Sequence, residues 1–150
     1  MGAKYLVVAT EDELSLPAAR EQSEGRRFIV TGVGGTNVIR ALRDIPKDAD
    51  ILNVGYCGSA NFAVGTALVI GRARLYHPNV EFAEAEFSLG AHGVTCLTAG
   101  DFVKDGAGIP KDCVVDMELA YIAALGFTDL RAVKYVSDNL DLEQYETRHK

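Results

Sequence analysis

The stretch Val114-Val115-Asp116-Met117-Glu118, continued by residues 119–124, Gly126 and the run 130–139, decides the class of fold. Asp116 and Glu118 stand where a helix is expected to begin, apolar residues continue it, and Gly126 is a natural stop. Residues 130–136 form an apolar run short enough for a buried strand. Ser137-Asp138-Asn139 then leaves the carboxyl end of that strand, the edge at which open α/β sheets bind ligands. The stretch therefore predicts that Glu118 and Asp138 face one crevice.

Length and composition favour a single packed domain over residues 1–150. The chain has 150 residues, of which 48% are apolar, and a domain of this size buries roughly 70% of its unfolded surface. The net charge is −6. Sequence-independent binding of nucleic acid needs a basic surface, so a nucleic-acid partner is not expected.

The sequence predicts a cytoplasmic protein without a membrane span or a metal. Met1 to Lys4 leads directly into a strand-like segment, and no apolar run approaches the roughly 20 residues of a membrane helix. The cysteines Cys57, Cys96 and Cys113 are widely spaced and match neither a metal site nor a disulfide framework. No cofactor is predicted either.

Strands alternate with glycine-rich turns and helices along the rest of the chain. Strands are predicted at Tyr5–Ala9, Phe28–Val30, Asp50–Val54, Thr66–Ile70 with a continuation over Arg72–Tyr76, and Val94–Leu97. Short helices are predicted after Thr10 and over residues 38–42, and Pro17 limits the first of them. Residues 78–92 show no clear period. This order predicts an α/β domain with a mixed, mainly parallel central sheet flanked by helices.

Two glycine-rich turns follow predicted strands, and neither matches a nucleotide-binding motif. Gly32-Val33-Gly34-Gly35-Thr36-Asn37 has Asn37 where a dinucleotide fingerprint needs its third glycine, and no Gly-Lys-Ser/Thr follows for a P-loop. One interpretation is a tight strand-to-helix connection that needs the φ freedom of glycine. The other is a helix start whose amides face an anion or a ribose. Gly55-Tyr56-Cys57-Gly58-Ser59 allows the same two interpretations.

Several short motifs, in order, resemble the purine nucleoside phosphorylase and nucleosidase family, and within it the methylthioadenosine/S-adenosylhomocysteine nucleosidases. Val136-Ser137-Asp138 resembles the Ile-Ser-Asp that carries the catalytic acid of those enzymes, and Val115-Asp116-Met117-Glu118 resembles their Val-Glu-Met-Glu. The other matching segments are Val8 to Leu14, Thr31 to Asn37, Asn53 to Ser59, Val64-Gly65-Thr66 and Thr98 to Phe102. The resemblance implies the three-layer phosphorylase/hydrolase-like fold.

The resemblance also implies an enzyme that cleaves the N-glycosidic bond of a purine nucleoside. Asp138 would protonate the leaving base and Glu13 would position the attacking water. Glu118 would hold the ribose hydroxyls. A general acid lowers the barrier to departure of the base, and carboxylates stabilise a sugar that develops positive charge. The implied substrate-binding residues are Glu118, Met117, Asp116, Phe102, Val103, Tyr56, Cys57 and Gly58.

The chain departs from the family pattern at several points. Tyr56 stands where the pattern has a small serine, and Asp116 replaces a glutamate. The segment between Glu13 and Phe28 is too short for the usual helix and hairpin. Only twelve residues follow Asp138, so the long C-terminal helix of the family is not expected. These differences imply an altered choice of substrate or a loss of activity.

Three functional alternatives follow. Phosphorolysis needs a cationic phosphate pocket, and Asn53-Val54-Gly55-Tyr56-Cys57-Gly58 lacks the arginine and serine of the phosphorylase motif, so hydrolysis is favoured. A non-catalytic nucleoside-binding protein on the same fold is the main rival. The third is a homo-oligomer in which a second copy completes a shortened subunit.

Overall fold

The computed structural model describes residues 2–76, 86–100 and 109–140. Its elements, in chain order, are β1 (Lys4–Val8), η1 (Glu11–Ser15), α1 (Pro17–Glu21), β2 (Arg27–Val30), α2 (Gly35–Leu42), β3 (Asp50–Gly58), β4 (Ala67–Tyr76), β5 (Glu86–Ser88), β6 (Val94–Ala99), β7 (Cys113–Asp116), α3 (Leu119–Ala124) and β8 (Asp129–Asp138). The alternation of strands with helices predicted from the sequence is confirmed.

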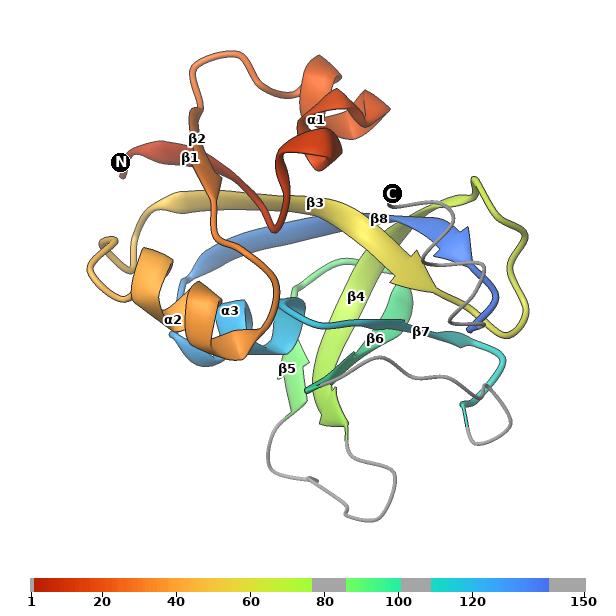
Figure 1. Ribbon diagram of the computed structural model, residues 1–150. Helices are drawn as coiled ribbons and strands as arrows, with labels where there is room; N and C mark the ends of the chain where they lie inside the picture. The colour runs from red at the N-terminus through yellow and green to blue at the C-terminus, as the bar shows by residue number, and fades with distance from the viewer. Residues whose placement is uncertain (1, 77–85, 101–108, 141–150) are drawn as a thin grey trace.

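The strands in the described residues form one mixed sheet, part of which closes on itself. β1 lies between β2 and β3, and all three are parallel. β3 continues in parallel to β8, β8 pairs antiparallel with β4, and β4, β6 and β7 run parallel to one another. An antiparallel contact between Gly58 and Val115 joins β7 back to β3. The strands β3, β8, β4, β6 and β7 therefore form a closed ring, from which β1 and β2 extend (Figure 1).

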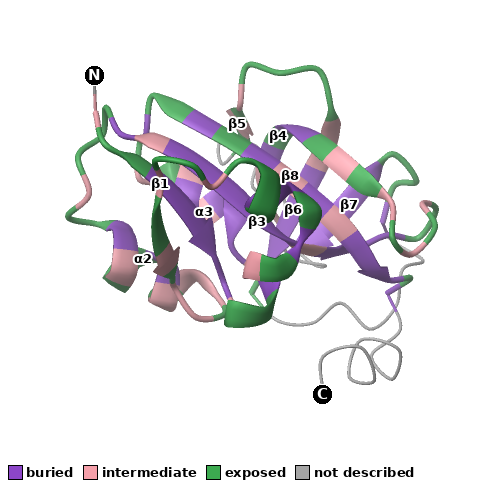
Figure 2. Cartoon of the chain, turned by 90° about the horizontal axis from the view of Figure 1, so that it is seen from above, coloured by how far each residue is buried: buried purple, intermediate pink, exposed green. Residues whose placement is uncertain are grey.

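Helices cover the extended part of the sheet on both faces, as predicted. Figure 1 shows α2 and α3 side by side on one face and η1 with α1 on the other. Val38, Leu42 and Ile122 bury their side chains in the core beneath α2 and α3. Leu16 and Ala19 pack on Leu6, Val8, Leu52 and Val54 in the second core. In Figure 2, β3 is buried along most of its length, whereas β4 also carries exposed and half-buried residues.

The prediction for residues 114–118 is partly wrong. Residues Cys113–Asp116 form the strand β7, and α3 begins only at Leu119 with Glu118 as its N-cap. The period of two was hidden because all four residues of β7 are buried, so no polar residue alternates with an apolar one. Gly126 ends the helix with a φ of 89°, as predicted.

The first helical segment is divided in two, as Pro17 indicated. Thr10 caps the 3-10 helix η1 in a capping box with Glu13, and Pro17 occupies the first turn of α1. The polar segment that follows is not uniformly exposed. Arg26 is buried against the amino ends of the strands, where its Nη1 donates to the carbonyl oxygen of Tyr5 and to Asp50 Oδ1, both at 3.0 Å.

A tyrosine hydrogen bond links α1 to the sheet, in addition to the apolar packing of this face. The amide of Ala18 donates to the hydroxyl oxygen of Tyr135, on β8, at 2.8 Å. We expect Tyr135→Phe to lower the melting temperature by about 2–4 °C, because the loss of one partly buried hydrogen bond costs about 1 kcal/mol. Calorimetry checks this, with Tyr121→Phe as a control that keeps the ring packed against Gly35. Equal melting temperatures for the two variants would contradict the prediction.

Candidate functional site

Glu13 brings its carboxylate from η1 across the carboxyl ends of β1 and β3. Its Oε1 accepts hydrogen bonds from the amides of Ala9, at 2.7 Å, and Thr10, at 3.1 Å. Its Oε2 accepts one from the amide of Tyr56 at 2.8 Å. The side chain is buried. The capping box explains the geometry, because a capping glutamate turns back toward the start of its own helix. Of the three acids at positions 11–13, Glu13 is therefore the one that faces inward.

The absence of a side chain at Gly55 leaves space for this carboxylate. A Cβ atom at position 55 would lie 2.8 Å from Glu13 Oε2 and 3.2 Å from Lys134 Nζ. Glu13 and Lys134 therefore meet over the same glycine of β3. Glycine is required at position 55 because a larger residue would occupy the space in which these two side chains approach the strand.

Lys134 is a buried cation that was not among the site residues predicted from the sequence. It lies on β8 with 1% of its surface exposed, and its Nζ is 3.0 Å from Asp116 Oδ2. Residues 130–136 were predicted to form a largely apolar strand. The period of two of that strand could have identified Lys134 as buried, because Ala132, Lys134 and Val136 share one face and both Ala132 and Val136 belong to the core. A lysine on the inward face of a strand indicates a buried partner.

Asp116 is bound on both carboxylate oxygens. Oδ1 accepts from the hydroxyl of Thr98 at 2.6 Å, and Oδ2 accepts from the amide of Leu119 at 2.8 Å as well as from Lys134. Burial alone would raise the pKa of Asp116, but the adjacent ammonium and these hydrogen bonds hold the pKa below its usual value. Burial would likewise lower the pKa of Lys134, but the Asp116 carboxylate and other nearby acids raise it. The pair is therefore ionised.

Glu118 lies beside this ion pair, between the starts of α2 and α3. Its Oε2 accepts a hydrogen bond from the amide of Gly34 at 2.8 Å. Burial raises the pKa of Glu118 to about 7, and the negative charge of Asp116 adds to the rise. Lys134 and the Gly34 amide act in the opposite direction. Glu118 is therefore a carboxyl group that changes its charge near neutral pH.

Asp138 is the last residue of β8. It lies opposite Gly58 of β3, three residues beyond Gly55. The pairing of β3 with β8 shifts by one residue here, so that Cys57 faces Val136 and Gly58 faces Asp138. Such a bulge re-aims the side chains that follow it. The amide of Leu140 donates to Asp138 Oδ1 and the hydroxyl of Ser137 to Oδ2, both at 2.9 Å. These two bonds fix the plane of the carboxyl group.

Strained backbone follows Asp138. Leu140 has a φ of 65° and is the sole residue other than glycine with positive φ in the described ranges. A bulky residue in this conformation is an outlier that its surroundings must hold in place. Leu140 is buried beside Gly58, where a Cβ atom would lie 2.9 Å from Asp138 Oδ1. Asn139 Nδ2 donates to the carbonyl oxygens of Ser59, at 2.9 Å, and Phe62, at 3.0 Å.

Four other predicted site residues are Met117, Cys57, Phe102 and Val103. Met117 is half-buried next to Glu118. Burial raises the pKa of the Cys57 thiol to about 12; Lys134 acts against this rise, and the charges of Asp116 and Asp138 add to it. Phe102 and Val103 lie outside the described residues.

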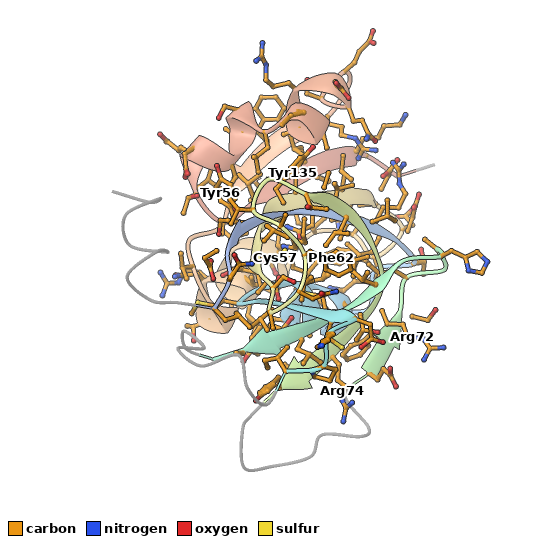
Figure 3. All side chains as sticks on the ribbon, turned by 90° about the vertical axis from the view of Figure 1, so that its right-hand side faces the viewer. Tyr56, Cys57, Phe62, Arg72, Arg74 and Tyr135 are labelled. Carbon is orange, nitrogen blue, oxygen red and sulfur yellow. The ribbon has the colours of Figure 1, made fainter. Side chains whose placement is uncertain are left out.

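The backbone and the side chain of Tyr56 lie in different surroundings. Its amide binds Glu13, but its side chain packs in the core on the side of η1 and α1, near Tyr135. Figure 3 shows Tyr56 and Tyr135 toward those helices, whereas Cys57 and Phe62 lie toward the ring of strands and Arg72 and Arg74 lie away at its edge. Because successive side chains of a strand face opposite ways, Gly55 and Cys57 share a face that Tyr56 cannot share. The tyrosine ring therefore lies on the opposite side of β3 from Gly55 and Cys57.

The first glycine-rich turn serves the packing of the protein and binds a side chain. Gly32 and Gly34 have φ of 90°, and a Cβ atom at Gly35 would lie 2.7 Å from the ring of Tyr121. The amide of Gly34 donates to Glu118. The tight connection anticipated from the sequence is thus present, and at least one of its amides faces a carboxylate of the protein itself.

Among the described residues, no group of three or more His, Cys, Asp or Glu side chains could hold a metal ion. Among the helices of residues 2–76, 86–100 and 109–140, none has the length and apolar character needed to cross a bilayer.

Comparisons with known proteins identify solved structures that share this fold. No protein-family model and no curated protein matches the sequence. Solved structures do match. The 5′-methylthioadenosine/S-adenosylhomocysteine nucleosidase of Neisseria meningitidis, in complex with methylthio-immucillin-A, has a TM-score of 0.74 at 17% identity, covering 99% of this chain and 91% of that one. The MTAN of Chlamydia trachomatis bound to MTA has a TM-score of 0.75 at 20% identity, covering 99% and 88%.

The chain has the fold of these nucleosidases. The futalosine hydrolase of Helicobacter pylori also shares the nucleosidase fold, with a TM-score of 0.67 at 15% identity and coverage of 97% and 88%. The predicted three-layer α/β fold with a mixed sheet is therefore confirmed, and so is the resemblance to the nucleosidases at the level of the fold. Identities this low leave the role of each side chain to be argued from this chain alone.

We predict that Glu118 makes the stability of the protein depend on pH. An acid whose pKa rises from 4.5 to about 7 on folding holds its proton more tightly in the native state. Its contribution is therefore complete below pH 4.5 and is lost as the pH rises toward 7. Glu118→Gln removes the titration. The free energy of unfolding of this variant, relative to wild type, should increase between pH 4.5 and pH 7, by at most about 3 kcal/mol.

Urea denaturation across this pH range provides the measurement. The exposed Glu21→Gln is the matched control, which should follow the wild-type curve at every pH. A stability difference between Glu118→Gln and wild type that does not change with pH would show that Glu118 titrates normally.

A second prediction concerns the ion pair. Lys134→Met leaves the buried Asp116 without its cation, which should destabilise the protein by about 3–5 kcal/mol. Adding Asp116→Asn to that variant removes the unpaired charge and should recover part of the loss. Chemical denaturation of the single and double variants checks this. If the double variant is less stable than Lys134→Met, then Asp116 does not depend on the lysine.

Proposed function

We propose that the protein is an enzyme that hydrolyses the N-glycosidic bond of a purine nucleoside of the methylthioadenosine or S-adenosylhomocysteine kind. The observation that supports the proposal is a group of three buried carboxyl groups in a chain with the nucleosidase fold: Glu13 lies beside Gly55 and Asp138 beside Gly58 of β3, and Glu118 lies within electrostatic reach of Glu13 and of the ion pair between Asp116 and Lys134. They come from three separate elements, and each is held by hydrogen bonds from backbone amides.

In the proposed reaction the bond between the sugar carbon and the base nitrogen breaks, and its electron pair leaves with the base. Asp138 supplies a proton to the departing base, which lowers the barrier to departure. The sugar becomes an electron-poor, oxocarbenium-like centre. Water held by Glu13 attacks that centre and gives up its proton to the Glu13 carboxylate, while Glu118 holds the ribose hydroxyls.

Hydrolysis agrees with the charges of the site better than phosphorolysis does. Among the described residues, the cation that touches this group of acids is Lys134, and its ammonium is engaged by Asp116. A phosphate placed near Glu13 and Asp116 would meet negative charge, which disfavours its binding. A phosphate-dependent reaction is therefore the weaker alternative.

The proposal includes a nucleoside as ligand and a cytoplasmic homo-oligomer. Apolar side chains are exposed on the edge strand β2, where Phe28 is 55% and Val30 43% exposed. An edge strand with such side chains is a surface that a second subunit could cover. The alternative function is a binder that holds a nucleoside without cleaving it.

The test is release of adenine from methylthioadenosine and from S-adenosylhomocysteine in phosphate-free buffer. We expect wild type to release adenine, and Asp138→Asn to reduce kcat by about 10²- to 10⁴-fold, the usual contribution of a general acid. Asp129→Asn is the matched control, because Asp129 is exposed at the opposite end of the same strand. Its rate should equal that of wild type.

Each other outcome selects a different conclusion. Release that Asp138→Asn leaves intact would refute the role of Asp138. Release that vanishes without phosphate would indicate a phosphorylase. A nucleoside that raises the melting temperature and is never cleaved would support the binding protein.

A further inference from the structure

The start of α3 is capped in an unusual way. Glu118 occupies the N-cap position, but its side chain accepts no hydrogen bond from the first turn. Two side chains outside the helix do so instead. The amide of Leu119 donates to Asp116 Oδ2 at 2.8 Å, and the amide of Ala120 donates to Thr98 Oγ1 at 2.9 Å. The otherwise unpaired amides of a helix start are thus satisfied without Glu118.

Because Asp116 and Thr98 bind the amides at the start of α3, the carboxyl group of Glu118 is available for another contact. It points away from its own helix and accepts from Gly34, the N-cap of α2. Had Glu118 capped α3, its carboxyl group would be held beside the amides of its own first turn. The position of Glu118 therefore depends on the side chains that took over its capping role.

Thr98 is the residue that ties these contacts together. It is fully buried on β6, directly opposite Asp116 on β7. Its hydroxyl donates to Asp116 Oδ1 at 2.6 Å and accepts from Ala120. One hydroxyl thus orients Asp116 and anchors the helix start. Lys134 holds the other oxygen of Asp116 from β8.

We propose that Thr98 and Asp116 are positioning residues for the proposed nucleosidase reaction: they cap α3 in place of its N-cap residue and thereby hold Glu118 where it binds the ribose hydroxyls. This role rests on the proposed function for its consequence in catalysis. The geometry that supports it, a cap supplied by two neighbouring strands, can be tested without any substrate.

Charged groups from every neighbouring element act on Glu118. Asp116 on β7 and Glu13 on η1 raise its pKa, whereas Lys134 on β8 and the Gly34 amide of α2 lower it. A substitution of Thr98 that displaces Asp116 would change the largest effect of a neighbouring charge on the pKa of Glu118. The titration of Glu118 therefore reports directly on whether Thr98 holds this arrangement.

The kinetic test compares Thr98→Val, which keeps the shape and removes the hydroxyl, with Thr98→Ser, which restores a hydroxyl. We expect Thr98→Val to raise the KM for methylthioadenosine about tenfold or more with a smaller change in kcat, since a buried acceptor and a buried amide lose their partner. Thr98→Ser should recover most of the loss. Thr128→Val, which removes an exposed threonine hydroxyl far along the chain, should match wild type.

A double-mutant cycle separates positioning from general damage. In a protein that already carries Glu118→Gln, Thr98→Val should add little to the KM, because both substitutions remove the same contact with ribose. Equal effects of Thr98→Val in the presence and absence of Glu118→Gln would overturn the proposal. So would equal KM values for Thr98→Val and Thr98→Ser.

Carbon-13 NMR titration of Glu118 gives a reading that needs no activity. The Glu118 signal is assigned by its loss in Glu118→Gln. We expect its midpoint to agree in wild type and Thr98→Ser and to be displaced in Thr98→Val. If wild type releases no base, the proposed function fails, and the titration still decides on Thr98. Identical titration curves in all three proteins would overturn the positioning role.

Discussion

The arrangement of the acids depends on the buried ion pair between Asp116 and Lys134. Asp116 lies on β7 and Lys134 on β8. In the closed ring of strands, β7 pairs with β6 and β8 pairs with β3. Removing two charges from water is costly, and their mutual attraction repays that cost only when the remaining donors and acceptors are also satisfied. Thr98 and the amide of Leu119 complete the set around Asp116. The pair therefore links the ring to the start of α3.

The same ion pair shapes the electrostatics of the neighbouring acids. Asp116 keeps Lys134 charged, and the negative charge of Asp116 raises the pKa of Glu118. One ammonium thus stands against three buried carboxyl groups, those of Glu13, Asp116 and Glu118. Such a site disfavours anionic co-substrates and favours a sugar that develops positive charge. This is the physical basis for preferring hydrolysis to phosphorolysis.

Irregular backbone holds the carboxyl group of Asp138 in position, whereas the ion pair helps to hold that of Glu118. The register shift between β3 and β8 places Asp138 opposite Gly58, and the amide of Leu140, a residue with positive φ, donates to the carboxylate. Strain of this kind persists only when surrounding contacts impose it. Here the buried side chain of Leu140 and the two hydrogen bonds of Asn139 are such contacts.

Local patterns in the sequence were sufficient for the class of fold, for most strands, and for the placement of Asp138 at a strand end, but they left open which of the acids at positions 11–13 faces inward. They hid β7, whose residues are all buried, and they hid Lys134, whose partner lies eighteen residues away on another strand. The face taken by Tyr56, the closed ring and the capping of α3 by Thr98 were decided only by the tertiary structure. The physical reason is that periodicity and capping act between neighbours in the chain, whereas the pairing of buried charges is settled by which strands pack together.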